Sequence, residues 1–327
     1  MQRYLNASTQ LVSHRKYTTR YVAHIQPVLG GKAADAITRG DLLRLYLDKQ
    51  REVVRRGERR RAEGETYSKA FCKSLLDIIG AAYGRELAGE NPQVRRNPMA
   101  GLYKANPQLA YLANEKERTF TACEAAAILR TAHGNGNGNG DLIAWRFALL
   151  AIATGARRGA LLRLKRRDID LAAGTIRLID EKAESTDAKA CAYAIPFASF
   201  ASAQLADHLA ALGSEDLVVW GNYLSPQSGE VPTAQVINHR VQPIIDAVVE
   251  GNAAVRGNAR LTLHTFRSFA ITALLDCGCP EFLARRFSNH STKRRGSFDR
   301  YVKATIEQMR PHIERATAMF REVYEMG

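Results

Sequence analysis

The sequence predicts a mainly α-helical protein with a small antiparallel β-sheet, an α+β fold built from two domains. Most of the chain repeats apolar residues at helical spacing, whereas Thr175–Ile179 and Ala192–Pro196 read as two strands that could pair across a polar turn. A length of 327 residues is too great for one small core and fits two domains. Hydrophobic content of 46% with 24% charged residues is ordinary globular composition, which argues against wholesale disorder.

The first domain is expected over residues 1–112 and is helical. Leu42, Leu45 and Val53 recur at helical spacing, and Asp41 is expected to cap that helix. A further helix is expected over 66–87. Asn-Pro pairs then break the pattern, so residues 98–114 look like a linker, and the connection between the domains is placed at 113–117.

The second domain is expected over residues 118–327. Thr121 is expected to cap its first helix, with Glu124 completing a capping box. A buried helix is predicted over 142–153, followed by the two strands and, from residue 201 on, mostly helix. The Gly-Asn repeat at 134–140 indicates a surface loop and not a phosphate cradle, because no Gly-Lys-Ser/Thr follows it.

The net charge of +14 is concentrated at the N-terminal end. Through Lys116 the chain has 21 basic and 11 acidic residues, and the remainder has 26 and 22. This asymmetry is expected of a part that lies against a polyanion, although solvated basic faces alone would also produce it.

Cysteine use and hydropathy indicate the compartment. Five scattered cysteines, with only Cys277 and Cys279 close together, lack a second pair to complete a zinc site and are expected to be reduced thiols. The N-terminus lacks the apolar stretch of a signal peptide, and no apolar run reaches the ~18 residues that span a bilayer. We therefore expect a cytoplasmic, nucleoid-associated protein without membrane contact.

Five residues carry the chemistry by their order and spacing. Arg157 closes Thr-Gly-Ala-Arg, His264 and Arg267 form His-x-x-Arg, and His290 and Tyr301 follow. Arginines can hold phosphate oxygens, histidines can move protons, and a tyrosine hydroxyl can attack phosphorus. The set is therefore what cleavage of a phosphodiester by tyrosine requires.

Each of these residues also has a plainer interpretation. His264 and Arg267 lie three apart on one predicted helix face, and a buried arginine there asks for either a structural carboxylate or a bound phosphate. Arg157 could be a surface arginine, and Tyr301 is one of 12 tyrosines. Competing signatures, such as His-Glu-x-x-His, Gly-x-Ser-x-Gly and the phosphate loop, are missing from the sequence, and no acidic cluster suggests a metal-dependent nuclease.

Taken together, these motifs resemble the tyrosine recombinase (phage integrase) family. The first matching box runs from Ala153 to Leu164, and the second from Leu263 to Ala270, with His290 and Tyr301 after it. The resemblance covers the whole chain and implies an N-terminal helical DNA-clamping domain followed by a C-terminal catalytic domain. The family usually has an acidic residue where Ala160 stands, glycine where Asn289 stands, and often histidine or lysine where Ser268 stands.

The resemblance also implies roles and partners. Arg157 and Arg267 would clamp the scissile phosphate, and Tyr301 would attack it to leave a 3′-phosphotyrosine. His264 would assist proton transfer, His290 would hydrogen-bond the phosphate, and a hairpin lysine, Lys182 or else Lys189, would protonate the leaving oxygen. Neither metal nor cofactor is needed, because the phosphodiester energy stays in the covalent intermediate.

The implied partner is a double-stranded DNA recombination site, bound by a protein that is a monomer in solution and a homotetramer on DNA. The amphipathic stretch after Tyr301 either covers its own domain or docks on a neighbouring subunit. Six arginines are expected to contact DNA: Arg55, Arg56, Arg59, Arg60, Arg294 and Arg295. Three alternatives remain open: a type IB topoisomerase or telomere resolvase, a DNA-binding protein of the same fold without catalysis, and a basic RNA-binding protein.

Overall fold

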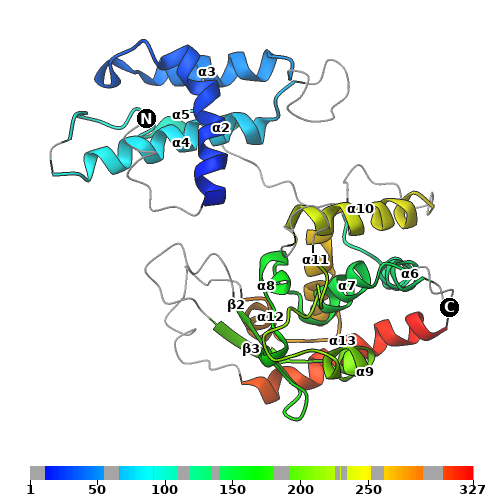
Figure 1. Cartoon of the computed structure of the whole chain (residues 1–327). Coiled ribbons are helices and arrows are strands. Elements are labelled where there is room, and N and C mark those ends of the chain that lie inside the picture. The colour runs from blue at the N-terminus through cyan, green and yellow to red at the C-terminus, as the bar shows by residue number, and fades with distance from the viewer. Residues whose placement is uncertain are drawn as a thin grey trace. The chain divides into compact units, whose positions relative to one another are not determined.

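The computed structural model describes ten stretches of the chain: residues 12–54, 66–90, 92–109, 118–134, 140–179, 192–224, 229, 234–251, 261–289 and 305–326 (Figure 1). Two units make up the chain, Met1–Glu115 and Lys116–Gly327, and each has its own hydrophobic core. Both are mainly helical, and a small antiparallel sheet lies in the second, which confirms the predicted fold class.

The first unit packs three long helices, α2 (Val12–Leu29), α3 (Arg39–Arg51) and α4 (Lys69–Leu87). Leucines of α3 and α4, among them Leu42, Leu45 and Leu75, are fully buried between them. The prediction that Asp41 caps α3 is wrong. Thr38 is the N-cap, and the Asp41 carboxylate accepts from its backbone N–H at 3.0 Å, because Asp41 stands at the third helical position, where a capping-box acid belongs.

Residues 98–109 are not the linker that the proline pattern predicts. They form α5 (Leu102–Ala105) and a 3₁₀ turn (Pro107–Leu109), and Leu102 and Leu109 are buried in the core of the first unit. The asparagine-proline pairs follow the end of α4 at Leu87 but do not end the unit, since the chain after them still carries apolar residues that the core covers. Helix α4 likewise starts at Lys69, with Ser68 as N-cap, and not at residue 66.

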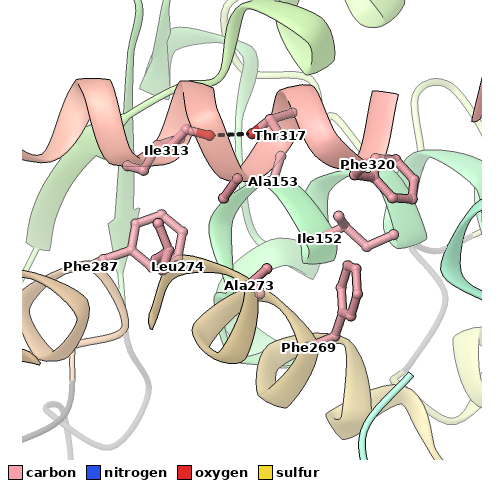
Figure 2. Close-up of a pocket in the computed structure, with 11 residues that line it drawn as sticks. Ile152, Ala153, Phe269, Ala273, Leu274, Phe287, Ile313, Thr317 and Phe320 are labelled. Atoms are coloured by element: carbon pink, nitrogen blue, oxygen red, sulfur yellow. Dashed lines mark hydrogen bonds between the residues drawn. The ribbon is translucent and has the colours of Figure 1, made fainter. Parts of the chain in front are cut away.

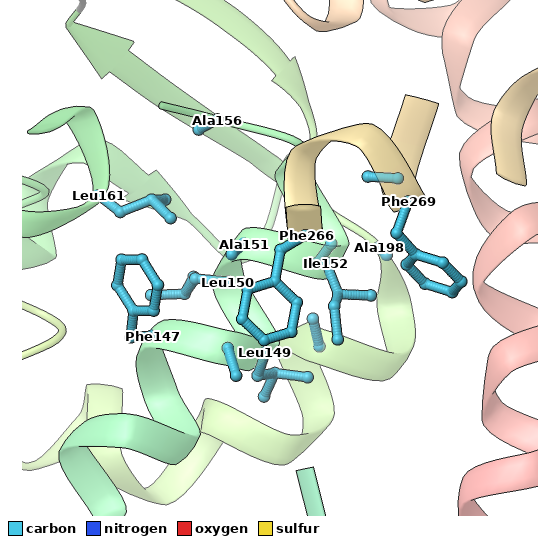
Figure 3. Close-up of a cluster of buried hydrophobic side chains, with 14 of the residues drawn as sticks. Phe147, Leu149, Leu150, Ala151, Ile152, Ala156, Leu161, Ala198, Phe266 and Phe269 are labelled. Atoms are coloured by element: carbon cyan, nitrogen blue, oxygen red, sulfur yellow. The ribbon is translucent and has the colours of Figure 1, made fainter. Parts of the chain in front are cut away.

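In the second unit, an apolar helix lies at the centre. α7 (Leu142–Thr154) is buried along nearly its whole length, and it packs against α6 (Ala122–His133), α9 (Ser199–Ala210), α10 (Ala234–Gly251) and α11 (Leu263–Asp276). Figure 3 shows Phe266 of α11 beside Leu149 and Ile152 of α7. The helix that carries His-x-x-Arg is thus packed against the helix that leads to Arg157.

The sheet has the order β1-β2-β3, formed by Ile169–Asp170, Thr175–Ile179 and Ala192–Pro196. The two predicted strands and their antiparallel pairing are confirmed, with Leu178 opposite Tyr193. Strand β1 has only two residues, too few for alternating hydrophobicity to predict it from the sequence. Along β2, Ile176 and Leu178 face the core, as period-two patterning requires.

Two helices complete the second unit, α12 (Glu281–Phe287) and α13 (Ile306–Glu325). The amphipathic helix predicted after Tyr301 is confirmed as α13, and it packs on its own domain. Figure 2 shows Ile313 and Phe320 of α13 facing Leu274 and Phe269 of α11 around a small apolar pocket. Arg130 of α6 donates to the Val323 carbonyl at the far end of α13 at 2.9 Å. None of the described helices is long and apolar enough to cross a bilayer.

At the start of α6, a buried carboxylate accepts several hydrogen bonds that should contribute to the stability of the second unit. Thr121 caps it as predicted, and the buried Glu124 carboxylate accepts from the Thr121 N–H at 2.9 Å and from Arg118 at 2.9 and 3.0 Å. Glu124→Ala leaves both donors without this acceptor and should lower the free energy of unfolding by about 2–3 kcal/mol. Tryptophan fluorescence measures this in the full chain, because both tryptophans, Trp145 and Trp220, lie in the second unit.

The matched control is Glu281→Ala, which removes an acid from the first turn of α12. The Glu281–Arg285 pair is exposed, with side chains 70% and 54% accessible, so its loss should cost no more than about 0.5 kcal/mol. If the midpoint of the unfolding transition shifts equally in the two variants, the buried contacts of Glu124 contribute no more stability than the exposed Glu281–Arg285 pair does.

Candidate active site

The turn between α7 and α8 (Arg158–Leu162) determines where Arg157 emerges. The Thr154 hydroxyl donates to the Leu150 carbonyl at 2.6 Å and accepts from the Ala156 N–H at 3.2 Å. Gly155 ends α7 in the left-handed region, with φ of 55°. These contacts leave Arg157 extended and half-buried at the start of α8. Small residues are needed here, since a Cβ on Gly155 would lie 2.9 Å from the Phe287 ring.

Arg267 lies on α11 and is only 3% exposed. Its guanidinium donates to the Gly155 carbonyl at 2.7 Å and also to the Ser288 carbonyl, immediately after α12. One side chain therefore joins the turn before Arg157 to the residues that lead towards His290. This planar two-donor arrangement suits arginine and not lysine.

The electrostatics of Arg267 indicate a second nearby cation. Burial, together with the nearby charge of Arg157, lowers the pKa of Arg267 to about 10. The group stays protonated at neutral pH. Two guanidinium groups that repel each other in a partly dehydrated place would both be stabilised by an anion with several oxygens, such as a phosphate.

His264 and Arg267 share α11, as predicted, but their surroundings differ. His264 lies in the first turn and is exposed, whereas Arg267, one turn later, is buried. The expectation of two side chains on one buried face is therefore wrong for the histidine, because the first turn of α11 is not covered on that side. An exposed imidazole is accessible to a ligand that approaches from solvent.

Tyr193 is a site residue that sequence reasoning missed. It is buried on β3, and burial raises the pKa of its hydroxyl while the charges of Arg267, Arg157 and Arg286 oppose that rise. A neutral phenol therefore lies within the electrostatic range of the two motif arginines. Strand alternation could place Tyr193 on the inner face of the sheet, but nothing in the sequence connects that face with the arginines.

Asn289 occupies a conformation that explains its residue type. It is the one non-glycine described residue with positive φ, 47°, and its N–H donates to the Arg286 carbonyl at 3.2 Å. Glycine adopts this region without cost and asparagine tolerates it better than most residues. Asparagine can thus replace glycine here with the turn retained. Of the other two departures, Ala160 is buried in the core and Ser268 is half-buried on α11.

Several predicted site residues lie outside the described residues. They are Lys182, Lys189, His290, Tyr301, Arg294, Arg295, Arg55, Arg56, Arg59 and Arg60. Of the predicted catalytic set, the structure thus describes Arg157, His264 and Arg267. Within the described part of the chain, no group of three His, Cys, Asp or Glu side chains could hold a metal ion.

Among the comparisons with known proteins, the one with solved structures identifies the fold. No family model and no curated protein matches the sequence. Among solved structures, a lambda integrase dimer bound to a core site is 17% identical, with a TM-score of 0.63 over 93% of this chain and 96% of that one. The Tn1549 transposon integrase, in complex with circular intermediate DNA, is 15% identical, with a TM-score of 0.63 over 96% and 97%.

A lambda integrase tetramer bound to a Holliday junction matches at 17% identity and a TM-score of 0.60, over 93% of this chain and 79% of that one. These matches cover 93% to 96% of this chain and therefore extend over both units. This chain therefore has the fold of the tyrosine recombinases.

Proposed function

We propose that this protein is a site-specific DNA recombinase or integrase that cleaves and rejoins strands through a 3′-phosphotyrosine. The observation that carries the proposal is the hydrogen bond from Arg267 to the Gly155 carbonyl, two residues before Arg157. It brings together two arginines from distant parts of the sequence, in a fold whose solved examples include DNA complexes.

In this mechanism, Arg157 and Arg267 bind the non-bridging oxygens of the scissile phosphate and stabilise the charge that develops on them. The Tyr301 hydroxyl attacks phosphorus, and the 5′-oxygen leaves with a proton from the hairpin lysine. His264 takes up the proton that Tyr301 releases, and His290 hydrogen-bonds the phosphate. Reversal by a 5′-hydroxyl from another strand completes exchange, so the step needs no external energy.

The first unit would serve as the DNA-clamping domain. Its excess of positive charge, including the basic run that ends at Arg61, predicts affinity that falls steeply with salt. Strand exchange between two duplexes requires four active sites, so we propose a tetramer on DNA.

The test uses a duplex selected from a randomised pool by its binding to the protein, and nicked so that cleavage is trapped. Incubated with a chelator, the wild-type protein should form a covalent protein–DNA band on a denaturing gel. Tyr301→Phe should abolish the band and keep DNA binding, because only the attacking oxygen is lost. Tyr324→Phe is the matched control, since Tyr324 packs against Phe200 and Phe320.

A wild-type protein that binds the selected duplex tightly and forms no band would show that the fold is kept without catalysis. If Tyr301→Phe still forms the covalent band, a residue other than Tyr301 is the nucleophile. Relaxation of supercoiled DNA, or hairpin ends, without joining of two duplexes would favour a topoisomerase or a telomere resolvase.

A further inference from the structure

Arg158 is a second arginine at the start of α8 with a different environment from Arg157. It is exposed, and its guanidinium donates to the Asn238 side-chain oxygen of α10 at 2.8 Å. Arg158 thus faces α10, whereas the charge of Arg157, the extended residue before it, acts on Arg267. The two neighbouring arginines thus present charge in two directions from one turn.

Arg158 differs from two other cations of the second unit because its partner is a neutral amide and not a carboxylate. Arg240 of α10 pairs with Asp141 at 2.7 Å, and Lys165 pairs with Glu215 at 2.7 Å. Within the described part of the chain, no carboxylate pairs with Arg158. An unneutralised, exposed guanidinium attracts anions.

The first half of α10 supports the same conclusion. Its outer residues beside Asn238 are Gln235 and His239, both exposed, and its two acids, Asp246 and Glu250, lie in the second half. The outer face of α10 beside Asn238 therefore carries hydrogen-bonding side chains and no acidic residue. Such a surface suits the sugar–phosphate backbone of DNA.

Arg158 is also held in place. Asn238 fixes one guanidinium nitrogen, and α10 is itself tied to the start of α11, because the Gln242 side chain donates to the Leu261 carbonyl at 2.9 Å. A guanidinium with one donor engaged keeps four N–H groups for another acceptor. Arg158 is thus a pre-oriented cation one residue from Arg157.

We propose that Arg158, oriented by Asn238, binds a DNA backbone phosphate beside the scissile one and so positions the strand for the arginine pair. This inference rests on the proposed function. It assigns to Arg158 a contact with substrate outside the reacting phosphate, and to Asn238 the task of orienting that contact. The alternative is that the Arg158–Asn238 bond only joins α8 to α10.

The experiment measures DNA affinity against salt concentration by fluorescence anisotropy, with the selected duplex and the full chain in the Tyr301→Phe background. Each phosphate contact contributes about 0.9 to the slope of log affinity against log salt. Arg158→Ala should therefore reduce the slope by about 1 and weaken binding several-fold. Asn238→Ala should keep the slope, because the charge remains, and weaken binding less.

Arg285→Ala is the matched control, since Arg285 is equally an exposed arginine but is paired with Glu281. It should leave the slope unchanged. An unchanged slope in Arg158→Ala would overturn the proposal, as would equal losses of tryptophan-monitored stability in Arg158→Ala and Asn238→Ala without any effect on binding.

The proposed function fails separately from this inference. If the wild-type protein forms no covalent band but Arg158→Ala still reduces the slope, the phosphate contact stands and the catalytic proposal falls. If the band forms and the slope does not change, Arg158 is not a DNA contact.

Discussion

Arg267→Lys should lower the rate of covalent band formation about 10²–10³-fold while DNA binding is largely kept. The lysine keeps the charge, so the salt dependence of binding should change little. It cannot, however, donate to the Gly155 carbonyl, the Ser288 carbonyl and a phosphate oxygen in one plane, as the guanidinium can. Single-turnover band formation at saturating duplex measures the effect.

Arg130→Lys is the matched control for Arg267→Lys. Arg130 also donates to two backbone carbonyls, those of Val323 and Tyr324, at 2.9 and 3.2 Å, but at the end of α13. Its replacement should lower stability and leave the rate for folded protein unchanged. If both variants lose rate alike, Arg267 acts through stability and not through the phosphate.

Gly155→Ala should lower the free energy of unfolding of the second unit by about 2–5 kcal/mol. Two costs add: the left-handed backbone, about 1–2 kcal/mol for a residue with a Cβ, and a clash in a packed place, about 1–3 kcal/mol. The new Cβ would lie 2.9 Å from the Phe287 ring and 3.4 Å from the Ala270 Cβ. Denaturant titration followed by tryptophan fluorescence measures the change.

The same substitution should slow band formation, because Gly155 lies two residues before Arg157 and its carbonyl receives Arg267. Gly278→Ala separates the two costs. Gly278 has φ of 75° but nothing lies within 4 Å of its Cβ position, so only the backbone cost applies. If Gly155→Ala destabilises the protein no more than Gly278→Ala does, the contact between the new Cβ and the Phe287 ring costs no stability.

How much the sequence could predict depends on the range of the interaction concerned. The two longer strands were predicted with their bounds, and Thr121 with Glu124 was predicted as a capping box. Alternation and capping depend on residues within a few positions of each other. The error at Asp41 was also local: Thr38 and Asp41 satisfy the same backbone groups together, and composition does not say which of them is the cap.

Other features depended on packing. The proline pattern predicts a linker over residues 98–114, but the first core buries Leu102 and Leu109. Tyr193 is buried, and the charges of Arg267 and Arg157 act on it only because the fold brings these distant parts of the sequence near each other. His264 proved exposed although it lies one turn from Arg267, since the coverage of a helix end is set by its neighbours and not by its own spacing.

The sequence by itself determined the helices, the pair of strands and the motif arginines with their intervening spacing. Local sterics and near-neighbour hydrogen bonds suffice for the elements, and the residue types suffice for the chemistry. Only the tertiary structure decided that Arg267 joins the Gly155 turn to Ser288, and that Arg158 turns away towards Asn238. A buried guanidinium must find acceptors for its N–H groups, and which carbonyls lie within reach is fixed by the packing of α7, α11 and α12 and not by any pattern along the chain.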